Sequence, residues 1–170
     1  MVPFGPPEGA DRPYDEVVPT IEVFADIWCP FTHVGLHAIA DARRAAGRED
    51  LAMRVRPWPL ELVNGHPMDP ETAAHNAAAL RAQVAPDLFA HVDAEHFPTS
   101  TLEALALVEA AYRIDDATGE RASFAVRDAL FERALDIGDP AVLRAIATAL
   151  DVPMPEESDR AAVHAGWEAG

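Results

Sequence analysis

The chain has 170 residues, of which 49% are hydrophobic and 25% are charged. This length and composition fit one globular domain that can bury a core. The formal net charge is −16, and all 13 basic residues are arginine. Such an acidic surface argues against nucleic acid as a partner, because phosphate binding requires basic clusters. It argues against binding to an anionic membrane surface for the same reason.

The N-terminal residues 1–19 are rich in proline and acid and predict an irregular arm. They have neither the basic start nor the apolar run of a secretory signal, and no segment has the ~20 consecutive apolar residues of a membrane span. The single cysteine, Cys29, cannot form an internal disulfide, which suits a reducing compartment. We therefore expect a cytoplasmic protein.

Residues 20–62 predict a strand, a helix and a second strand. The β-rich run 21–27 (IEVFADI) forms the first strand. Pro30 suits the first turn of a helix that ends at Gly47, a residue able to adopt the left-handed conformation. Residues 51–56 alternate apolar and polar side chains, as a half-buried strand does, and Pro57 ends them. This order indicates a βαβ unit with parallel strands.

The rest of the chain is helical in pattern. Asp69-Pro70 begins a helix that runs to about residue 84, and the capping-box pattern 100–103 (STLE) begins another. The apolar residues of a third helix recur at steps of four, four and three and end before Gly138: Val126, Leu130, Ala134 and Ile137. Asp139-Pro140 begins the next helix. Residues 63–155 thus predict a helical block, and residues 156–170 predict the start of a C-terminal helix, from about 157 to 167.

Cys29 lies where the first strand meets the first helix, at the edge of an α/β sheet where ligands usually bind. A helix N-terminus favours the thiolate, which is the nucleophilic form of cysteine. The alternative is a small buried side chain without chemistry. Position alone leaves both interpretations open.

Several segments resemble the DsbA-like branch of the thioredoxin-fold proteins. Residues 24–36 (FADIWCPFTHVGL) are similar to its active-site segment, in which a strand ends in Asp-x-x-Cys-Pro-x-Cys. Residues 54–62 (RVRPWPLEL), 98–112 (PTSTLEALALVEAAY) and 129–153 (ALFERALDIGDPAVLRAIATALDVP) resemble later segments. The resemblance implies an α/β, thioredoxin-like fold with a large inserted helical block. Relatives include cytoplasmic disulfide oxidoreductases, 2-hydroxychromene-2-carboxylate isomerases and kappa-class glutathione transferases.

The sequence departs from that family in two places. Thr32 stands where a dithiol member has its second, resolving cysteine. After Pro155 no β-rich run follows, so the C-terminal strands and their cis-proline loop are missing. A truncated chain, a sheet completed by another molecule, as in a homodimer, and a degenerate member are the three interpretations. A two-stranded sheet leaves an exposed edge beside Cys29 or along the second strand, which is prone to pairing or aggregation.

The resemblance implies that Cys29 is a nucleophile. Thr32, three residues on along the helix, can donate a hydrogen bond to the thiolate, and His33 is a second candidate partner. Asp26 can relay a proton to the sulfur if it is buried; a solvated carboxylate is the alternative.

We expect the substrate to bind among the side chains around the thiol, although core packing is the alternative for the two tryptophans. These candidates are Trp28, Pro30, Phe31 and Trp58. Cys29, His33 and His37 share one helix face, but their span is too long for one ion and no fourth ligand is evident, so we expect no metal site.

The predicted function is a monothiol thiol–disulfide oxidoreductase. Because Thr32 cannot resolve a mixed disulfide, an external low-molecular-weight thiol must complete each turnover. We expect no bound cofactor, and a small-molecule or protein thiol or disulfide as the substrate. The alternatives are an isomerase or transferase that uses a glutathione-like thiol on small aromatic substrates, and a non-catalytic interaction protein with a degenerate fold.

Overall fold

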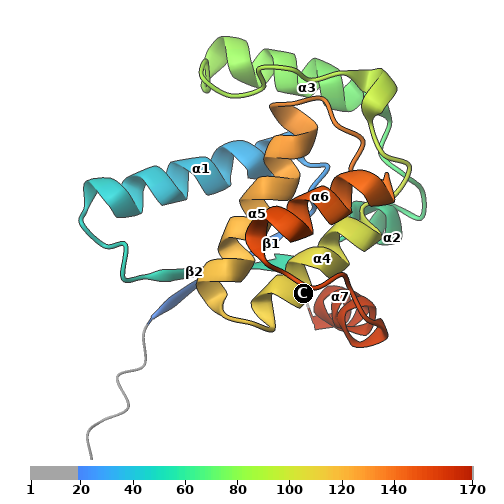
Figure 1. The fold of residues 1–170 in the computed structure, drawn as a ribbon. Coiled ribbons are helices and arrows are strands. Elements are labelled where there is room, and N and C mark those ends of the chain that lie inside the picture. Colours follow the sequence, from blue (N-terminus) through green and yellow to red (C-terminus); the bar gives the residue numbers. More distant parts are fainter. Residues whose placement is uncertain (1–18, 170) are drawn as a thin grey trace, which may run out of the picture.

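The computed structural model describes residues 19–169, which form a two-stranded parallel sheet and seven α-helices (Figure 1). This is a mixed α/β arrangement consistent with a thioredoxin-like fold that carries a helical insertion. The predicted arm, residues 1–19, lies outside the described residues except for its last position. The elements are β1 Thr20–Ala25, α1 Pro30–Ala45, β2 Ala52–Pro57, α2 Leu60–Asn64, α3 Pro70–Gln83, a 3₁₀ turn Ala94–His96, α4 Leu102–Tyr112, α5 Asp116–Phe131, α6 Pro140–Leu150 and α7 Glu157–Ala169.

The predicted βαβ unit is confirmed. β1 pairs in parallel with β2, and Val23 lies opposite Val55. Helix α1 begins at Pro30, and Gly47 adopts a left-handed conformation (φ 63°) just after the helix ends. β1 stops at Ala25, two residues earlier than predicted, because the chain turns toward α1 there.

The outer edge of β2 is covered by side chains from the helical layer. The Val55 N–H donates to the hydroxyl of Tyr112 at 2.8 Å, and that hydroxyl donates to the Met53 carbonyl at 3.2 Å. The Met53 N–H donates to Glu120 Oε2 at 3.3 Å. The prediction of an exposed edge is therefore wrong for β2, because α4 and α5 supply the hydrogen-bond partners that a further strand would provide.

Helix α5 passes very close to the ring of Tyr112 at this edge. A Cβ atom placed on Gly119 of α5 would lie 2.0 Å from Tyr112 Cδ1, so no larger residue fits without displacing the ring. The ring is buried, and burial raises the pKa of Tyr112 to about 12.

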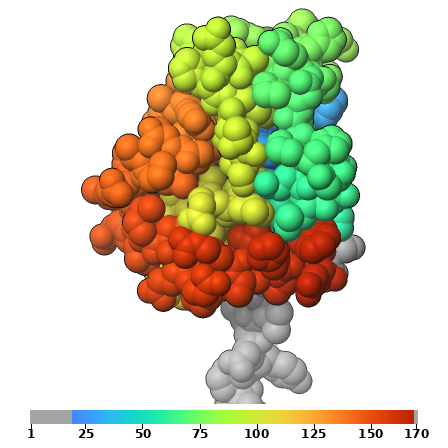
Figure 2. Space-filling model, turned by 90° about the vertical axis from the view of Figure 1, so that its right-hand side faces the viewer, coloured from blue at the N-terminus to red at the C-terminus, as the bar shows by residue number. Residues whose placement is uncertain are grey.

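Two groups of apolar side chains form the core. The smaller lies between α1 and the sheet and contains Ala25, Leu36, Met53 and Val55. The larger lies among the helices, with α4 at its centre between α5, α6 and α7. Figure 2 shows α7 crossing the base of one face of the molecule. Within residues 19–169, no helix combines the length and the apolar character needed to span a bilayer.

Helix α5 ends at Phe131, although the apolar spacing predicts a helix as far as Ile137. Ala134 is left-handed (φ 49°), and the Leu135 N–H returns to the Ala129 carbonyl at 2.9 Å. This turn still places Ile137 in the core, with none of its surface exposed. The apolar spacing therefore predicts the burial of Val126, Leu130 and Ile137 correctly, but not the extent of the helix.

The predicted capping box at residues 100–103 is also wrong. Helix α4 begins at Leu102, whose N–H donates to the hydroxyl of Ser100 at 3.2 Å. The Thr101 hydroxyl donates to Asp26 instead of capping its own helix, and Glu103 pairs with Arg160 of α7. The short helix α2 is a further element that the sequence pattern does not predict.

Replacing Tyr112 by phenylalanine should leave the Val55 N–H buried without a partner. We expect Tyr112→Phe to lower the free energy of unfolding by about 1–3 kcal/mol, as measured by urea denaturation. Thr148→Val, which removes an exposed hydroxyl bonded within α6, is the control and should change stability by less than about 0.5 kcal/mol. Equal stability of Tyr112→Phe and the native chain would show that this edge does not depend on the hydroxyl.

Candidate functional site

Cys29 is the N-cap residue of the 16-residue helix α1, with an extended backbone (φ −77°, ψ 109°). Its side chain is half-buried and has no disulfide partner. The first turn of α1 carries no acidic residue, so nothing in that turn neutralises the positive end of the helix dipole next to the sulfur. Cys29 therefore lies at the N-terminus of the first helix, where the sequence predicts it.

The hydroxyl of Thr32 is directed to the backbone beneath the thiol. It lies 2.9 Å from the Cys29 carbonyl and 3.2 Å from the Asp26 carbonyl. A hydroxyl has one hydrogen to donate, and here a carbonyl accepts it. The predicted hydrogen bond from Thr32 to the thiolate therefore requires the hydroxyl to rotate away, and in this structure Thr32 instead ties the first turn of α1 to the end of β1.

His33 is fully buried and faces α5. Its Nε2 lies 3.0 Å from Glu132 Oε1, while Glu132 also accepts hydrogen bonds from the backbone N–H groups of Phe89 (2.7 Å) and Ala90 (2.9 Å). Burial lowers the pKa of His33, with Glu132 opposing that effect. The sequence predicts a hydrogen bond between His33 and the thiolate. In the structure His33 Nε2 is instead hydrogen-bonded to Glu132.

Asp26 is 1% exposed, so the solvated-carboxylate alternative is wrong. Its Oδ1 accepts hydrogen bonds from the Trp28 N–H (3.2 Å) and the Thr101 hydroxyl (2.9 Å), and its Oδ2 accepts one from the Leu60 N–H. Burial nevertheless raises the pKa of Asp26, while these hydrogen bonds and the charge of Arg127 oppose the rise. Asp26 thus joins the segment before Cys29 to the starts of α2 and α4.

Arg127 of α5 supplies a buried cation that the sequence does not reveal. It is 1% exposed, and none of its guanidinium nitrogens has a hydrogen-bond partner among the described residues. Burial lowers the pKa of Arg127 to about 10, and the negative charges of Asp26 and Cys29 oppose that shift. A charge that acts on both groups places Arg127 within electrostatic reach of the candidate nucleophile.

The predicted substrate-binding residues divide into buried and exposed groups. Trp28 has no exposed surface and stacks on Phe97 with 6.5 Å between ring centroids, so it belongs to the core and offers no face to a substrate. Pro30 is buried as well. Phe31 is 57% exposed beside the thiol, and Trp58 is half-buried against Phe24. Only Phe31 and Trp58 therefore remain as candidates for substrate contact.

The model of the DSBA-like thioredoxin domain matches residues 20–164 of this chain. The chain belongs to this family. The match covers the βαβ unit, the helical block and most of α7, and it identifies a thiol–disulfide oxidoreductase family. The predicted family and fold class are therefore confirmed.

A solved structure of a proposed protein disulfide isomerase from Nitrosomonas europaea has a similar fold. It superposes with a TM-score of 0.70, at 18% sequence identity, over 89% of this chain and 77% of that one. No curated protein matches the chain. The structural likeness supports the thioredoxin-like fold and says nothing about substrate.

Two residues of the site were missed by the sequence analysis, Arg127 and Glu132, both near the end of α5. The predicted apolar face of that helix, which includes Val126 and Leu130, passes directly beside them. Apolar periodicity shows which face of this helix is buried, but it does not show that Glu132 contacts His33 or that Arg127 lies near Cys29.

The raised pKa of Asp26 predicts a specific pH dependence of stability. Between the pKa values of the unfolded and folded states the folded protein binds more protons, so stability falls as the pH rises through that window and is then level. Asp26→Asn should remove this fall, whose limiting slope is about 1.4 kcal/mol per pH unit. Urea unfolding from pH 4 upward measures it.

The matched control for that experiment is Asp41→Asn, which changes an exposed carboxylate of α1. The native chain and this control should show the same fall of stability with pH. If Asp26→Asn shows it too, another group is responsible.

Removing the charge of Arg127 should slow the reaction of Cys29 with an alkylating reagent. We expect Arg127→Met to react roughly threefold to tenfold more slowly at neutral pH, because about 1 kcal/mol of attraction to the anionic sulfur is lost. Its free energy of unfolding should not decrease, since an unpaired buried charge is removed. Arg127→Lys keeps the charge and should react at close to the native rate. An unchanged rate in Arg127→Met would exclude electrostatic help from this residue.

Proposed function

We propose that the protein is a monothiol thiol–disulfide oxidoreductase with Cys29 as its nucleophile. The observation that carries the proposal is the half-buried Cys29 at the start of α1, with no acid in the first turn and with Arg127 in electrostatic reach. The match of the DSBA-like thioredoxin domain to residues 20–164, which include this cysteine, supports the proposal. A structural cysteine would require none of these features.

The reaction proceeds by two exchanges that conserve electrons. The Cys29 thiolate attacks one sulfur of a substrate disulfide, forming a mixed disulfide and releasing the other sulfur as a thiolate. An external low-molecular-weight thiolate then attacks the substrate sulfur of the mixed disulfide. That step forms a new disulfide on the substrate and returns Cys29 to its thiolate form.

The neighbouring residues have supporting roles in this proposal. Thr32 lacks a sulfur and cannot resolve the mixed disulfide. Its role is to hold the start of α1 in place, through contacts of its hydroxyl with the carbonyls of Asp26 and Cys29. Asp26 positions the backbone before Cys29, and burial raises its pKa, which suits a group that exchanges a proton at the site. Phe31 and Trp58 offer apolar surface to either a small-molecule or a protein disulfide.

We also infer that the protein works in the cytoplasm, where low-molecular-weight thiols are kept reduced. The proposal needs such a thiol as a co-substrate and no bound cofactor.

The sharpest test compares the native chain with Thr32→Cys, which places a second sulfur one helical turn from Cys29. With a small-molecule disulfide, native protein should accumulate a mixed disulfide on Cys29, visible as an added mass. Thr32→Cys should form an internal disulfide that displaces the bound half of the substrate as a thiol, and in a single turnover without added thiol this release should be at least about tenfold faster than in the native protein. Cys29→Ser should form no adduct.

Thr32→Ser is the matched control, because it keeps a hydroxyl and should behave as the native chain does. The proposal fails if native protein forms no mixed disulfide while unfolded protein does, because Cys29 would then be an inert buried thiol.

A further inference from the structure

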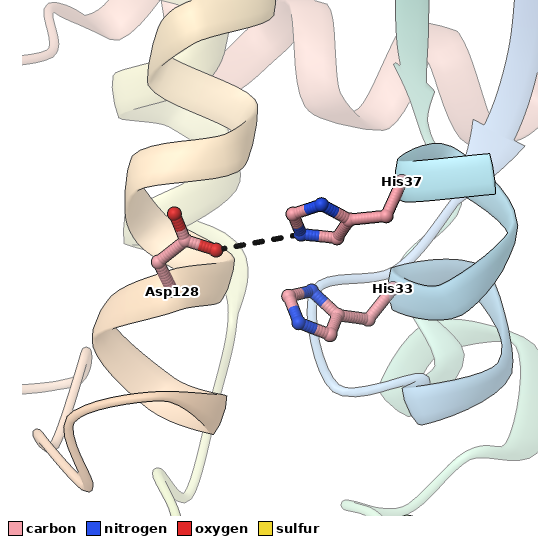
Figure 3. A group of neighbouring side chains, drawn as sticks. All are labelled: His33, His37 and Asp128. Carbon is pink, nitrogen blue, oxygen red and sulfur yellow. Dashed lines mark ion pairs between the residues drawn. The ribbon is translucent and has the colours of Figure 1, made fainter. Parts of the chain in front are cut away.

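Two histidines of α1 and an aspartate of α5 form a compact group outside the thiol site. His33, His37 and Asp128 each place one ligand atom within 4.8 Å of the others. Figure 3 shows the two imidazole rings, one helical turn apart, directed toward the carboxylate on the facing helix. His37 Nε2 and Asp128 Oδ1 are 3.6 Å apart, which is too long for a hydrogen bond.

The atoms that face one another in this group lack other partners. His33 Nδ1, His37 Nε2 and Asp128 Oδ1 are all buried and have no hydrogen-bond partner among the described residues. His33 has no exposed surface, so its free nitrogen cannot be satisfied by bulk water. Buried polar atoms are normally paired, and three unpaired atoms that converge indicate a missing ligand.

The hydrogen bond from His33 to Glu132 prepares the free nitrogen to bind a cation. Glu132 already accepts the N–H groups of Phe89 and Ala90, so it is an acceptor and His33 Nε2 must carry the hydrogen. In the neutral imidazole the lone pair then lies on Nδ1. A carboxylate bound to the remote nitrogen of a ligand histidine is the usual outer-shell arrangement of a zinc site.

We propose that His33 Nδ1, His37 Nε2 and Asp128 Oδ1 bind a divalent transition-metal ion, with Zn²⁺ the best match to this ligand set. Two imidazole nitrogens and a carboxylate oxygen suit zinc, and a fourth tetrahedral position stays open for water. Neighbouring ligands of tetrahedral zinc lie about 3.3 Å apart, so the 3.6 Å pair needs little movement. The wider separations in the group, up to 4.8 Å, must shorten when an ion binds.

The group can be reached from solvent. A hollow of about 350 Å³ between α1 and α5 is lined by both His37 and Asp128. Its wall also carries Glu49 and the ion pairs Arg43–Glu120 and Arg44–Asp41, and the chain as a whole has a net charge of −16, which attracts cations. This opening supplies the entry path that a metal site needs.

The span of Cys29, His33 and His37 is too long for one ion, and the sequence pattern shows no further ligand. In the structure Asp128, which is 91 residues beyond His37 in the chain, joins the two histidines in place of Cys29. The proposed site is therefore separate from the thiol and independent of the proposed oxidoreductase function.

Titration of the full chain with Zn²⁺ in a buffer that does not bind the metal, followed by calorimetry, tests the proposal. We expect one saturable site and a higher melting temperature in the presence of zinc, because an ion that binds only the folded state stabilises it. His37→Gln and Asp128→Asn each remove a ligand. They should weaken binding by more than the roughly 10–100-fold loss that outer-shell changes cause, while Glu132→Gln should fall within that range.

The controls separate this site from other ligands. His75→Gln and Asp87→Asn alter exposed residues elsewhere and should bind zinc as the native chain does. Cys29→Ser should bind zinc unchanged, and Co²⁺ bound to native protein should show no sulfur-to-metal charge-transfer band. The side chains of His37 and Asp128 are 30% and 41% exposed, so their variants should fold, which circular dichroism verifies.

Three results would overturn the proposal. The first is no saturable zinc binding to the native chain, which would leave a polar group filled by water. The second is native affinity in both folded variants, His37→Gln and Asp128→Asn. The third is loss of binding in Cys29→Ser, which would assign the metal to the thiol. None of these results bears on disulfide exchange at Cys29, which the mixed-disulfide experiment tests separately.

Discussion

The buried carboxylate of Asp26 is the junction on which the arrangement around the thiol depends. It receives hydrogen bonds from Trp28, Leu60 and Thr101, which belong to the turn before α1, the start of α2 and the residue that precedes α4. Removing water from a carboxylate is costly, and the raised pKa of Asp26 records that cost. The buried carboxylate therefore lowers the stability of the folded protein at neutral pH. It also fixes the backbone that leads into Cys29 and α1.

Two adjacent residues of helix α5, Arg127 and Asp128, place charged groups at two different sites. Arg127 lies within electrostatic reach of Asp26 and Cys29, while the next residue, Asp128, faces His37. Successive residues of a helix point about 100° apart, so one helix can serve both the thiol site and the proposed metal site. The two sites share helix α1 but use different side chains, and a metal ion bound by His33, His37 and Asp128 would link α1 to α5.

The sheet has two strands in the part of the chain that the structure describes, yet the edge of β2 is satisfied. Tyr112 and Glu120 bond to the backbone of Met53 and Val55, where a neighbouring strand would otherwise pair. Side chains can do this only if the helices come very close, and Gly119 allows that approach. Local sequence patterns contain no trace of such an arrangement, because each partner belongs to a different element.

The sequence by itself determined the local features: the parallel βαβ unit, the start of α1 at Pro30 and the caps at Asp69 and Asp139, whose side chains accept the N–H groups of the following turns. These features depend on neighbours a few residues apart, and Cys29 at a helix start is one of them. Only the tertiary structure decided which buried groups meet. His33 and Glu132 are 99 residues apart, and Asp26 and Thr101 are 75 apart. Periodicity shows that such residues are buried, but contacts between distant elements arise from packing, which one sequence does not encode in any local pattern.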